Sequence, residues 1–248
     1  MKNLIYKIIN ILDHSIQFRN LKVIKKELPY KINLFIDVGA HRGESLEFFN
    51  KHFKIKKKIL FEPNIECFEY LKKKFKKDKI YSFALSDKNT TKKFKIGQLS
   101  YMSTLNEINP NSFYTYFKNF IIFIFFFNHK IYPKQYSVKV KRLDGIIELK
   151  KEKIIDLIKI DTEGHELNVI KGMGKVINKT KLILFEYHYD DSIIKKYDFK
   201  DIEYYLKKKG FKVISKNKMI LRKGYEYIFK KILWYIWKKK FYIGVHLQ

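Results

Sequence analysis

The segment from Asp37 to Gly43 combines an acidic side chain with two glycines at the end of an apolar run. Gly39 and Gly43 allow a tight turn and a close approach of the backbone to a ligand. The helix predicted after this turn offers backbone N–H groups at its first residues, where phosphates often bind. The carboxylate of Asp37 instead favours a ligand with ammonium or hydroxyl groups. Such a turn is weak evidence alone, because many tight turns need glycine only for their shape.

Two further acidic positions follow apolar runs in the same half of the chain. Glu62 lies at the tip of the run ending in Phe61, where a carboxylate can accept hydrogen bonds from both ribose hydroxyls of a nucleoside. The alternative for Glu62 is a solvated loop position. Ser86 and Asp87 follow a third run and could hold an adenine edge, although a simple turn or helix cap explains them equally well.

A largely apolar run from 154 to 160, without polar alternation, ends in three acidic residues and a histidine. Asp161 and Glu163 could orient a substrate hydroxyl, accept its proton, or bind a divalent cation. Glu166 is interpreted as a solvated residue of a first helical turn, where acidic side chains are favourable. His188 follows another apolar run and could act as a general base near neutral pH, or be a packed or surface histidine.

The elements that carry these residues alternate between strands and helices. Strands are predicted at 33–38, 58–61, 79–84, 154–160 and 181–187, with helical patterns between them. This alternation predicts an α/β fold with a mostly parallel sheet, in which ligands bind at the carboxyl ends of the strands. The predicted domain spans 31–223 and ends in a hairpin of 211–215 and 218–222.

Three other segments break the alternation. Residues 1–30 predict an amphipathic N-terminal helix, and 88–142 predict a hairpin-rich insertion. The apolar run 120–127 is too short to cross a bilayer, and a buried strand or helix is preferred over a membrane-dipping loop. Residues 224–248 predict a basic amphipathic helix. Packing on the domain is one hypothesis for it, and contact of 225–240 with an anionic membrane is the other.

The composition limits the classes of protein to consider. The net charge is +28, yet only four of the 53 basic residues are arginine, so nucleic acid is not the expected partner. The single cysteine excludes a disulfide within the chain and a cysteine-based zinc site. No signal peptide is recognised at the N-terminus. A cytoplasmic location is expected, at the inner membrane face if the basic ends bind lipid.

Six segments between residues 33 and 190 together resemble the FkbM family of methyltransferases: FIDVGAHRGES, LFEPN, FALSD, VKVKRLD, DLIKIDTEGHELNVIKGM and LILFEYH. The resemblance implies a Rossmann-like class I methyltransferase fold. Such a fold has a mostly parallel seven-stranded sheet with the last strand antiparallel and helices on both faces. It also implies S-adenosylmethionine as methyl donor and O-methylation of a small molecule, such as a sugar or glycan precursor.

The resemblance also implies roles for individual residues. The cofactor-binding residues would be Asp37, Gly39, Ala40, His41, Gly43, Ser45, Glu62, Pro63, Asn64, Ser86 and Asp87. Asp161 and Glu163 would lie near the transferred methyl group, with His188 or Asp161 as the base. His41 replaces an asparagine that is usual in the family. A divalent metal remains an open alternative without support, and a basic nucleic-acid-binding or nucleic-acid-methylating protein is the competing function.

Overall fold

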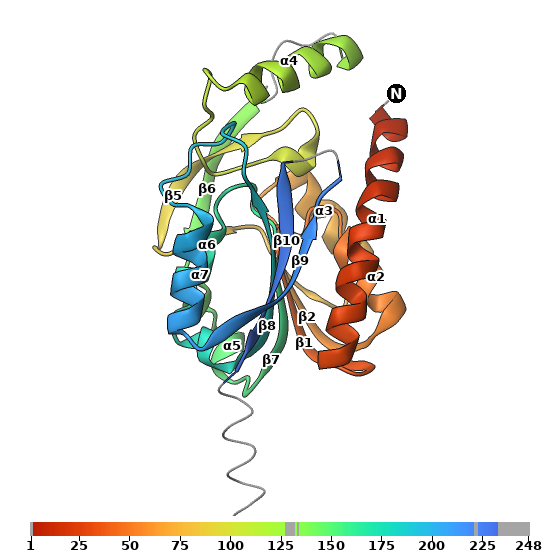
Figure 1. The fold of residues 1–248 in the computed structure, drawn as a ribbon. Helices are drawn as coiled ribbons and strands as arrows, with labels where there is room; N and C mark the ends of the chain where they lie inside the picture. The colour runs from red at the N-terminus through yellow and green to blue at the C-terminus, as the bar shows by residue number, and fades with distance from the viewer. Residues whose placement is uncertain (1, 127–131, 133, 221–222, 233–248) are drawn as a thin grey trace, which may run out of the picture.

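The computed structural model describes residues 2–126, 132, 134–220 and 223–232 (Figure 1). A seven-stranded sheet forms its centre, in the order β3-β2-β1-β7-β8-β10-β9. The strands are β1 (Lys31–Val38), β2 (Lys54–Phe61), β3 (Lys79–Tyr81), β7 (Ile155–Ile160), β8 (Thr180–His188), β9 (Phe211–Lys218) and β10 (Gly224–Lys231). Neighbouring pairs from β3 to β8 are parallel, whereas β10 is antiparallel to both β8 and β9. The predicted fold class is therefore confirmed.

Helices cover both faces of this sheet (Figure 1). One face packs against α1 (Lys2–Glu27), α2 (Glu44–His52) and α3 (Ile65–Lys74), and the other against α5 (Ile147–Lys150), α6 (Glu166–Gly172) and α7 (Phe199–Lys208). Each face of the sheet therefore has its own hydrophobic core. In β1, Phe35 lies in the core beneath α1, α2 and α3, and Ile36 lies in the core on the opposite face; both are fully buried. A strand buried on both faces needs no polar alternation, which explains its continuous apolar run.

The segment predicted as an insertion forms a separate layer. β4 (Ala84–Leu85), β5 (Thr90–Ile96) and β6 (Lys134–Lys141) make a three-stranded sheet in which β5 and β6 are antiparallel. α4 (Phe113–Phe126) lies between β5 and β6 in sequence. The apolar run predicted to be buried is instead part of this helix, and Phe120, Phe123 and Ile124 are exposed. A helix was one of the two predicted structures for this run, but the prediction that the run is buried was wrong.

The C-terminal prediction was wrong over the part that the structure describes. Residues 224–231 form strand β10 between β8 and the edge strand β9, not a helix, so the sheet extends past the predicted boundary at 223. Tyr227 and Phe229 point into one core and Ile228 into the other. An apolar run buried on both faces can mimic a helical stripe when it is short. Residues 233–248 lie outside the described residues.

The predicted hairpin was also shifted along the chain. β9 continues through Asn217 to Lys218, and the connection to β10 lies around Met219 and Gly224. The N-terminal helix predicted at 1–30 is present as α1, which ends just before Pro29. Among the described residues, no helix combines the length and the apolar character needed to cross a bilayer.

Candidate active site

The turn after β1 passes very close to the end of β7. Gly39 has φ +80°, and a Cβ placed there would lie 1.8 Å from the carbonyl oxygen of Asp161. The backbone N–H groups of Gly39 and Ala40 both donate to the carbonyl of Phe61 at the end of β2. Gly43, at φ +87°, would place a Cβ 2.4 Å from the Phe75 ring. The turn at Gly39 therefore brings the ends of β1, β2 and β7 together, while Gly43 packs against the end of α3.

Asp37 is completely buried on the face of the sheet that carries Phe35, and neither carboxylate oxygen has a hydrogen-bond partner among the described residues. Burial raises the pKa of Asp37 to about 7, although nearby Lys159 opposes this shift. Lys159 is adjacent to Asp37 in the register of β1 and β7, and its Nζ lies 2.9 Å from Oδ2 of Asp161. A buried carboxylate without hydrogen bonds is costly, so a polar or cationic group is expected to contact it in the working protein.

Glu62 is held by backbone amides. His41 N–H donates to Oε2 and Asn64 N–H to Oε1, both at 2.7 Å. Burial raises the pKa of Glu62 to about 7, and these two amides partly oppose that rise. Each carboxylate oxygen can accept a second hydrogen bond. The fixed carboxylate can therefore receive two hydroxyl groups, as a ribose requires.

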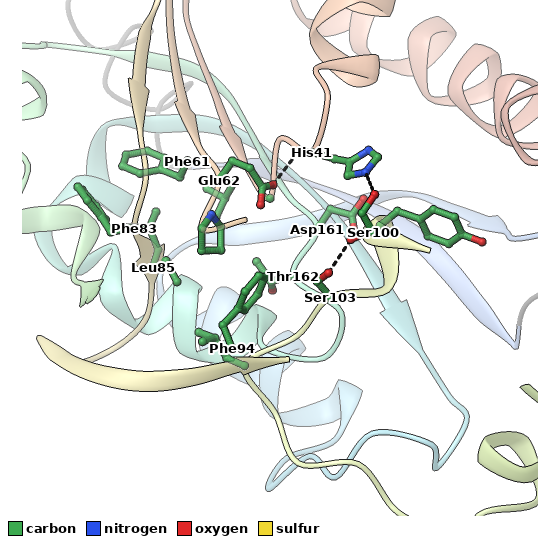
Figure 2. A pocket seen from close by; sticks show the side chains of 16 residues that line it. His41, Phe61, Glu62, Phe83, Leu85, Phe94, Ser100, Ser103, Asp161 and Thr162 are labelled. Atoms are coloured by element: carbon green, nitrogen blue, oxygen red, sulfur yellow. Dashed lines mark hydrogen bonds between the residues drawn. The ribbon is translucent and has the colours of Figure 1, made fainter. Parts of the chain in front are cut away.

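A pocket opens beside these strand ends (Figure 2). Its lining comes from the ends of β1, β2 and β7, from β4 and from the insertion: Val38, Gly39, His41, Phe61, Glu62, Pro63, Phe83, Ala84, Leu85, Phe94, Ser100, Tyr101, Ser103, Leu105, Asp161 and Thr162. His41 bridges Glu44 and Ser100 through its two ring nitrogens, at 2.9 and 2.7 Å. The insertion thus closes one side of the pocket, a role that the sequence did not reveal.

Several predicted cofactor residues lie outside this lining. Ser86 is buried and its Oγ lies 2.9 Å from Nε2 of His165, while Asp87 contacts Ser86 and Asn168. The pocket wall nearby is formed by Phe83, Ala84 and Leu85 instead. Asn64 caps α3 by accepting from the N–H groups of Glu66 and Cys67. Ala40 is buried next to the pocket, and no contact of Ser45 with the pocket is found among the described residues.

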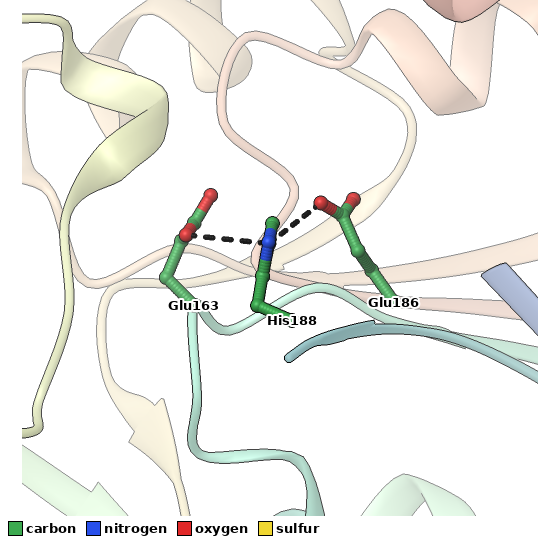
Figure 3. Close-up of side chains that lie close together, drawn as sticks. All are labelled: Glu163, Glu186 and His188. Carbon is green, nitrogen blue, oxygen red and sulfur yellow. Dashed lines mark ion pairs between the residues drawn. The ribbon is translucent and has the colours of Figure 1, made fainter. Parts of the chain in front are cut away.

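A second group of side chains lies at the ends of β7 and β8 (Figure 3). Nε2 of His188 lies 2.7 Å from Oε1 of Glu186 and 3.6 Å from Oε2 of Glu163. Nδ1 of His188 lies 3.9 Å from Oδ2 of Asp190. Glu186 and His188 are two residues apart on β8 and so share a face of the sheet. We call Glu163, Glu186 and His188 the acceptor cluster.

The turn between β7 and α6 is fixed by side chains that the sequence did not assign. Glu166 is buried, not solvated as predicted, and accepts from Thr162 Oγ1, Gly164 N–H and the Tyr197 hydroxyl. Glu163 has φ +49°, and its carbonyl accepts from Thr104 of the insertion. This strained turn directs the chain so that Glu163 reaches His188. Lys159, a single cation in an apolar run, was the one available signal for the buried ion pair.

A comparison with known families identifies this arrangement. The model described as the methyltransferase FkbM domain matches residues 37–213, which is more than half of the chain. The chain belongs to the FkbM methyltransferase family. The matched region is a methyltransferase domain. A comparison with curated proteins finds no significant match.

Several solved methyltransferase structures align with this FkbM domain. The methyltransferase FkbM from Methylobacillus flagellatus KT aligns with TM-score 0.53 and 14% identity, over 83% of this chain and 45% of that chain. This chain thus spans less than half of that relative's length. A methyltransferase from Clostridium acetobutylicum aligns with TM-score 0.47 at 12% identity, over 92% and 98% of the two chains. Magnesium protoporphyrin IX methyltransferase from Synechocystis PCC 6803 gives 0.47 at 8%, over 87% and 76%.

The residues of this FkbM domain fit S-adenosylmethionine. The buried carboxylate of Asp37 lacks a hydrogen-bond partner among the described residues, and the cofactor carries an ammonium and a sulfonium charge. Glu62 presents a carboxylate fixed by two amides at the adjacent strand end. The glycine turn leaves no room for a Cβ between β1 and β7. The sequence offered these features as a group, and the structure brings Asp37, Glu62 and Asp161 together at one edge of the sheet.

The acceptor cluster is also the one place among the described residues where a metal ion could be held. The three side chains offer ligand atoms that all lie within 4.8 Å of one another. However, Nε2 of His188 itself occupies the space between the two carboxylates. An imidazole in that position already offers both carboxylates an ion-pair partner. We therefore interpret the cluster as a proton acceptor and give no step to a metal.

Proposed function

We propose that this protein methylates a hydroxyl oxygen of a small molecule, a sugar or a glycan precursor. The observation that carries the proposal is the acceptor cluster, which begins just after Asp161 at the end of β7 and continues onto β8. An alcohol is a weak nucleophile until its proton is removed, so methylation of a hydroxyl calls for a positioned proton acceptor. An imidazole between two carboxylates is such a group.

The cofactor side of the site would be held by the turn at Gly39, by Asp37 and by Glu62. When bound, S-adenosylmethionine supplies an activated methyl group and leaves as S-adenosylhomocysteine. The chain therefore has to align the acceptor oxygen and remove one proton. Asp161, fixed by its ion pair with Lys159, is suited to orient the hydroxyl group at the pocket wall.

The acceptor cluster would take the hydroxyl proton. Nε2 of His188 accepts it, 2.7 Å from Oε1 of Glu186 and 3.6 Å from Oε2 of Glu163. Two carboxylates around one imidazole stabilise its protonated form. Two lysines lie close to this cluster. Lys195 donates to the carbonyl of His188, and Nζ of Lys118 lies 3.8 Å from Oδ1 of Asp190. Donors and acceptors that alternate in this way suit a ligand with several hydroxyl groups.

The proposal is tested with labelled S-adenosylmethionine and a panel of acceptors. The panel contains monosaccharides, nucleotide sugars, glycosides and, as the competing substrate class, total RNA. We expect a mass increase of one methyl group on a sugar hydroxyl and no transfer to RNA. Calorimetry with S-adenosylmethionine and NAD shows beforehand that the cofactor site is competent. Transfer to RNA alone would overturn the proposal and favour the nucleic-acid alternative.

A further inference from the structure

α4 turns its apolar face away from the protein. Phe113, Tyr116, Phe117, Phe120, Phe123 and Ile124 are all exposed, with Phe113 at 74% and Tyr116 at 72%. Their spacing of three and four residues places them on one stripe of the helix. A surface helix ordinarily buries such a stripe against the core. This helix does the reverse.

Polar side chains attach the opposite face of α4 to the domain. Thr115 is buried and donates to the Ser192 carbonyl at 3.5 Å, and Lys118 donates to Ser192 Oγ at 2.9 Å. Ser112, at the start of the helix, donates to Asp191 at 2.5 Å. The helix is thus held by hydrogen bonds to the loop after β8. Rotating it to bury the aromatic stripe would break these hydrogen bonds.

We propose that α4 docks this protein on the surface of an anionic lipid bilayer. An apolar stripe of this size in contact with water marks a docking surface. At 14 residues α4 is about 21 Å long, which suits a helix that lies in the interface and does not cross it. A polar face with lysine and an outer face with aromatic residues is the pattern of such helices.

The positive charge of the segment around α4 favours an anionic membrane as the surface that binds the aromatic stripe. No acidic residue occurs from 108 to 142, whereas this stretch contains five lysines and one arginine. Lys134 follows α4 at the start of β6. Basic residues close to an anionic surface are attracted to it. The N-terminal end of α1 lies at the same end of the molecule as α4 (Figure 1).

Docking through α4 has a consequence for the acceptor cluster. The loop that anchors α4 begins two residues after His188. If the function proposed above holds, the acceptor side of the site then faces the headgroup layer, which suits a hydroxyl acceptor attached to a lipid. The docking itself does not depend on the reaction.

The test uses the full chain and vesicles of phosphatidylcholine with or without phosphatidylglycerol. We expect cosedimentation with the anionic vesicles that falls with added salt. The double variant Phe117→Glu with Phe120→Glu should lose at least tenfold in bound fraction. Its matched control is Ile147→Glu with Tyr204→Glu, two exposed apolar residues far from α4 in sequence, which should bind like the wild type. Retained S-adenosylmethionine binding shows that both variants fold.

A fluorescent label on Phe120→Cys sharpens this test, because Cys67 is the only native cysteine and is buried. Anionic vesicles should shift its emission to the blue, whereas a label on Tyr204→Cys should not respond. Equal vesicle binding by the α4 variant and the wild type would overturn the proposal. So would a wild-type dimer that the α4 variant dissociates, because a second copy would then be the occupant. Neither outcome depends on methyl transfer.

Discussion

The cofactor side of the site is formed mainly by backbone groups, whereas the acceptor side is formed mainly by side chains. On the cofactor side, the glycine turn after β1 and the backbone amides that donate to Glu62 set the geometry. On the acceptor side, side chains dominate: the cluster around His188 and the contacts of the insertion with the turn at Glu163. Substitutions on the cofactor side should therefore be poorly tolerated. Substitutions on the acceptor side should change the reaction with the methyl acceptor and leave cofactor binding intact.

Gly39→Ala is expected to have the largest effect, because the new Cβ would lie 1.8 Å from the Asp161 carbonyl oxygen at φ +80°. We expect undetectable S-adenosylmethionine binding in calorimetry and a loss of more than about 4 kcal/mol in the free energy of unfolding. Gly145→Ala is the control, since a Cβ there meets nothing within 4 Å. It should change stability by less than about 0.5 kcal/mol. Normal cofactor binding by Gly39→Ala would contradict the close approach of β1 and β7.

His188→Gln tests the acceptor side. Loss of the imidazole should lower kcat by about 10²- to 10⁴-fold, as for other general bases. The affinity for S-adenosylmethionine should stay within about threefold, because the cluster lies outside the pocket lining. His52→Gln on α2 serves as the control. A variant that loses cofactor affinity as strongly as turnover would show that the two sides are not separate.

The pH dependence of stability should come from the cofactor side. Burial raises the pKa of Asp37 and of Glu62 to about 7, from ordinary values of 3.8 and 4.5. The folded protein therefore holds more protons than the unfolded chain between these values, so the free energy of unfolding falls as the pH rises from about 4 to 7.

A matched variant isolates the share of Asp37 in this effect. A shift of this size corresponds to about 2 to 4 kcal/mol, and Asp37→Asn should remove much of it in denaturant unfolding at pH 5 to 8. Glu66→Gln, on the exposed side of α3, should leave the curve unchanged. Affinity for the positively charged cofactor should rise over the same pH range in the wild type only. A flat stability curve for the wild type would refute this assignment.

Glu62→Gln should give the smallest of these effects. The amide group can accept one of the two backbone hydrogen bonds but places donors against the other. One lost hydrogen bond to a charged group corresponds to about 1.5 to 3 kcal/mol, or roughly ten- to hundredfold in cofactor affinity. Glu69→Gln, exposed on α3, is the control in the same calorimetric titration. Unchanged affinity would remove Glu62 from the cofactor side.

Much of the sheet could be predicted from the sequence, because strands buried on both faces carry continuous apolar runs and end in glycine or acidic residues. The two apolar aromatic runs outside the early strands were misinterpreted in different ways. The run in α4 was expected to be buried and is exposed, while 224–231 was expected to be part of a helix, packed on the domain or on a membrane, and is strand β10. An apolar sequence indicates that a segment favours contact with apolar surfaces, but it does not show which part of the molecule, or which partner, provides that surface.

The sequence by itself determined the order of strands and helices, the glycine turn after β1, and the acidic residues at the strand ends, because each depends on local backbone geometry. Only the tertiary structure decided that Lys159 balances Asp161, that Glu163 reaches His188, and that the insertion closes the pocket. The last two contacts join residues far apart in the chain, and the first depends on the burial of Lys159 in the folded sheet. Their free energy depends on burial and distance, which the folded protein sets.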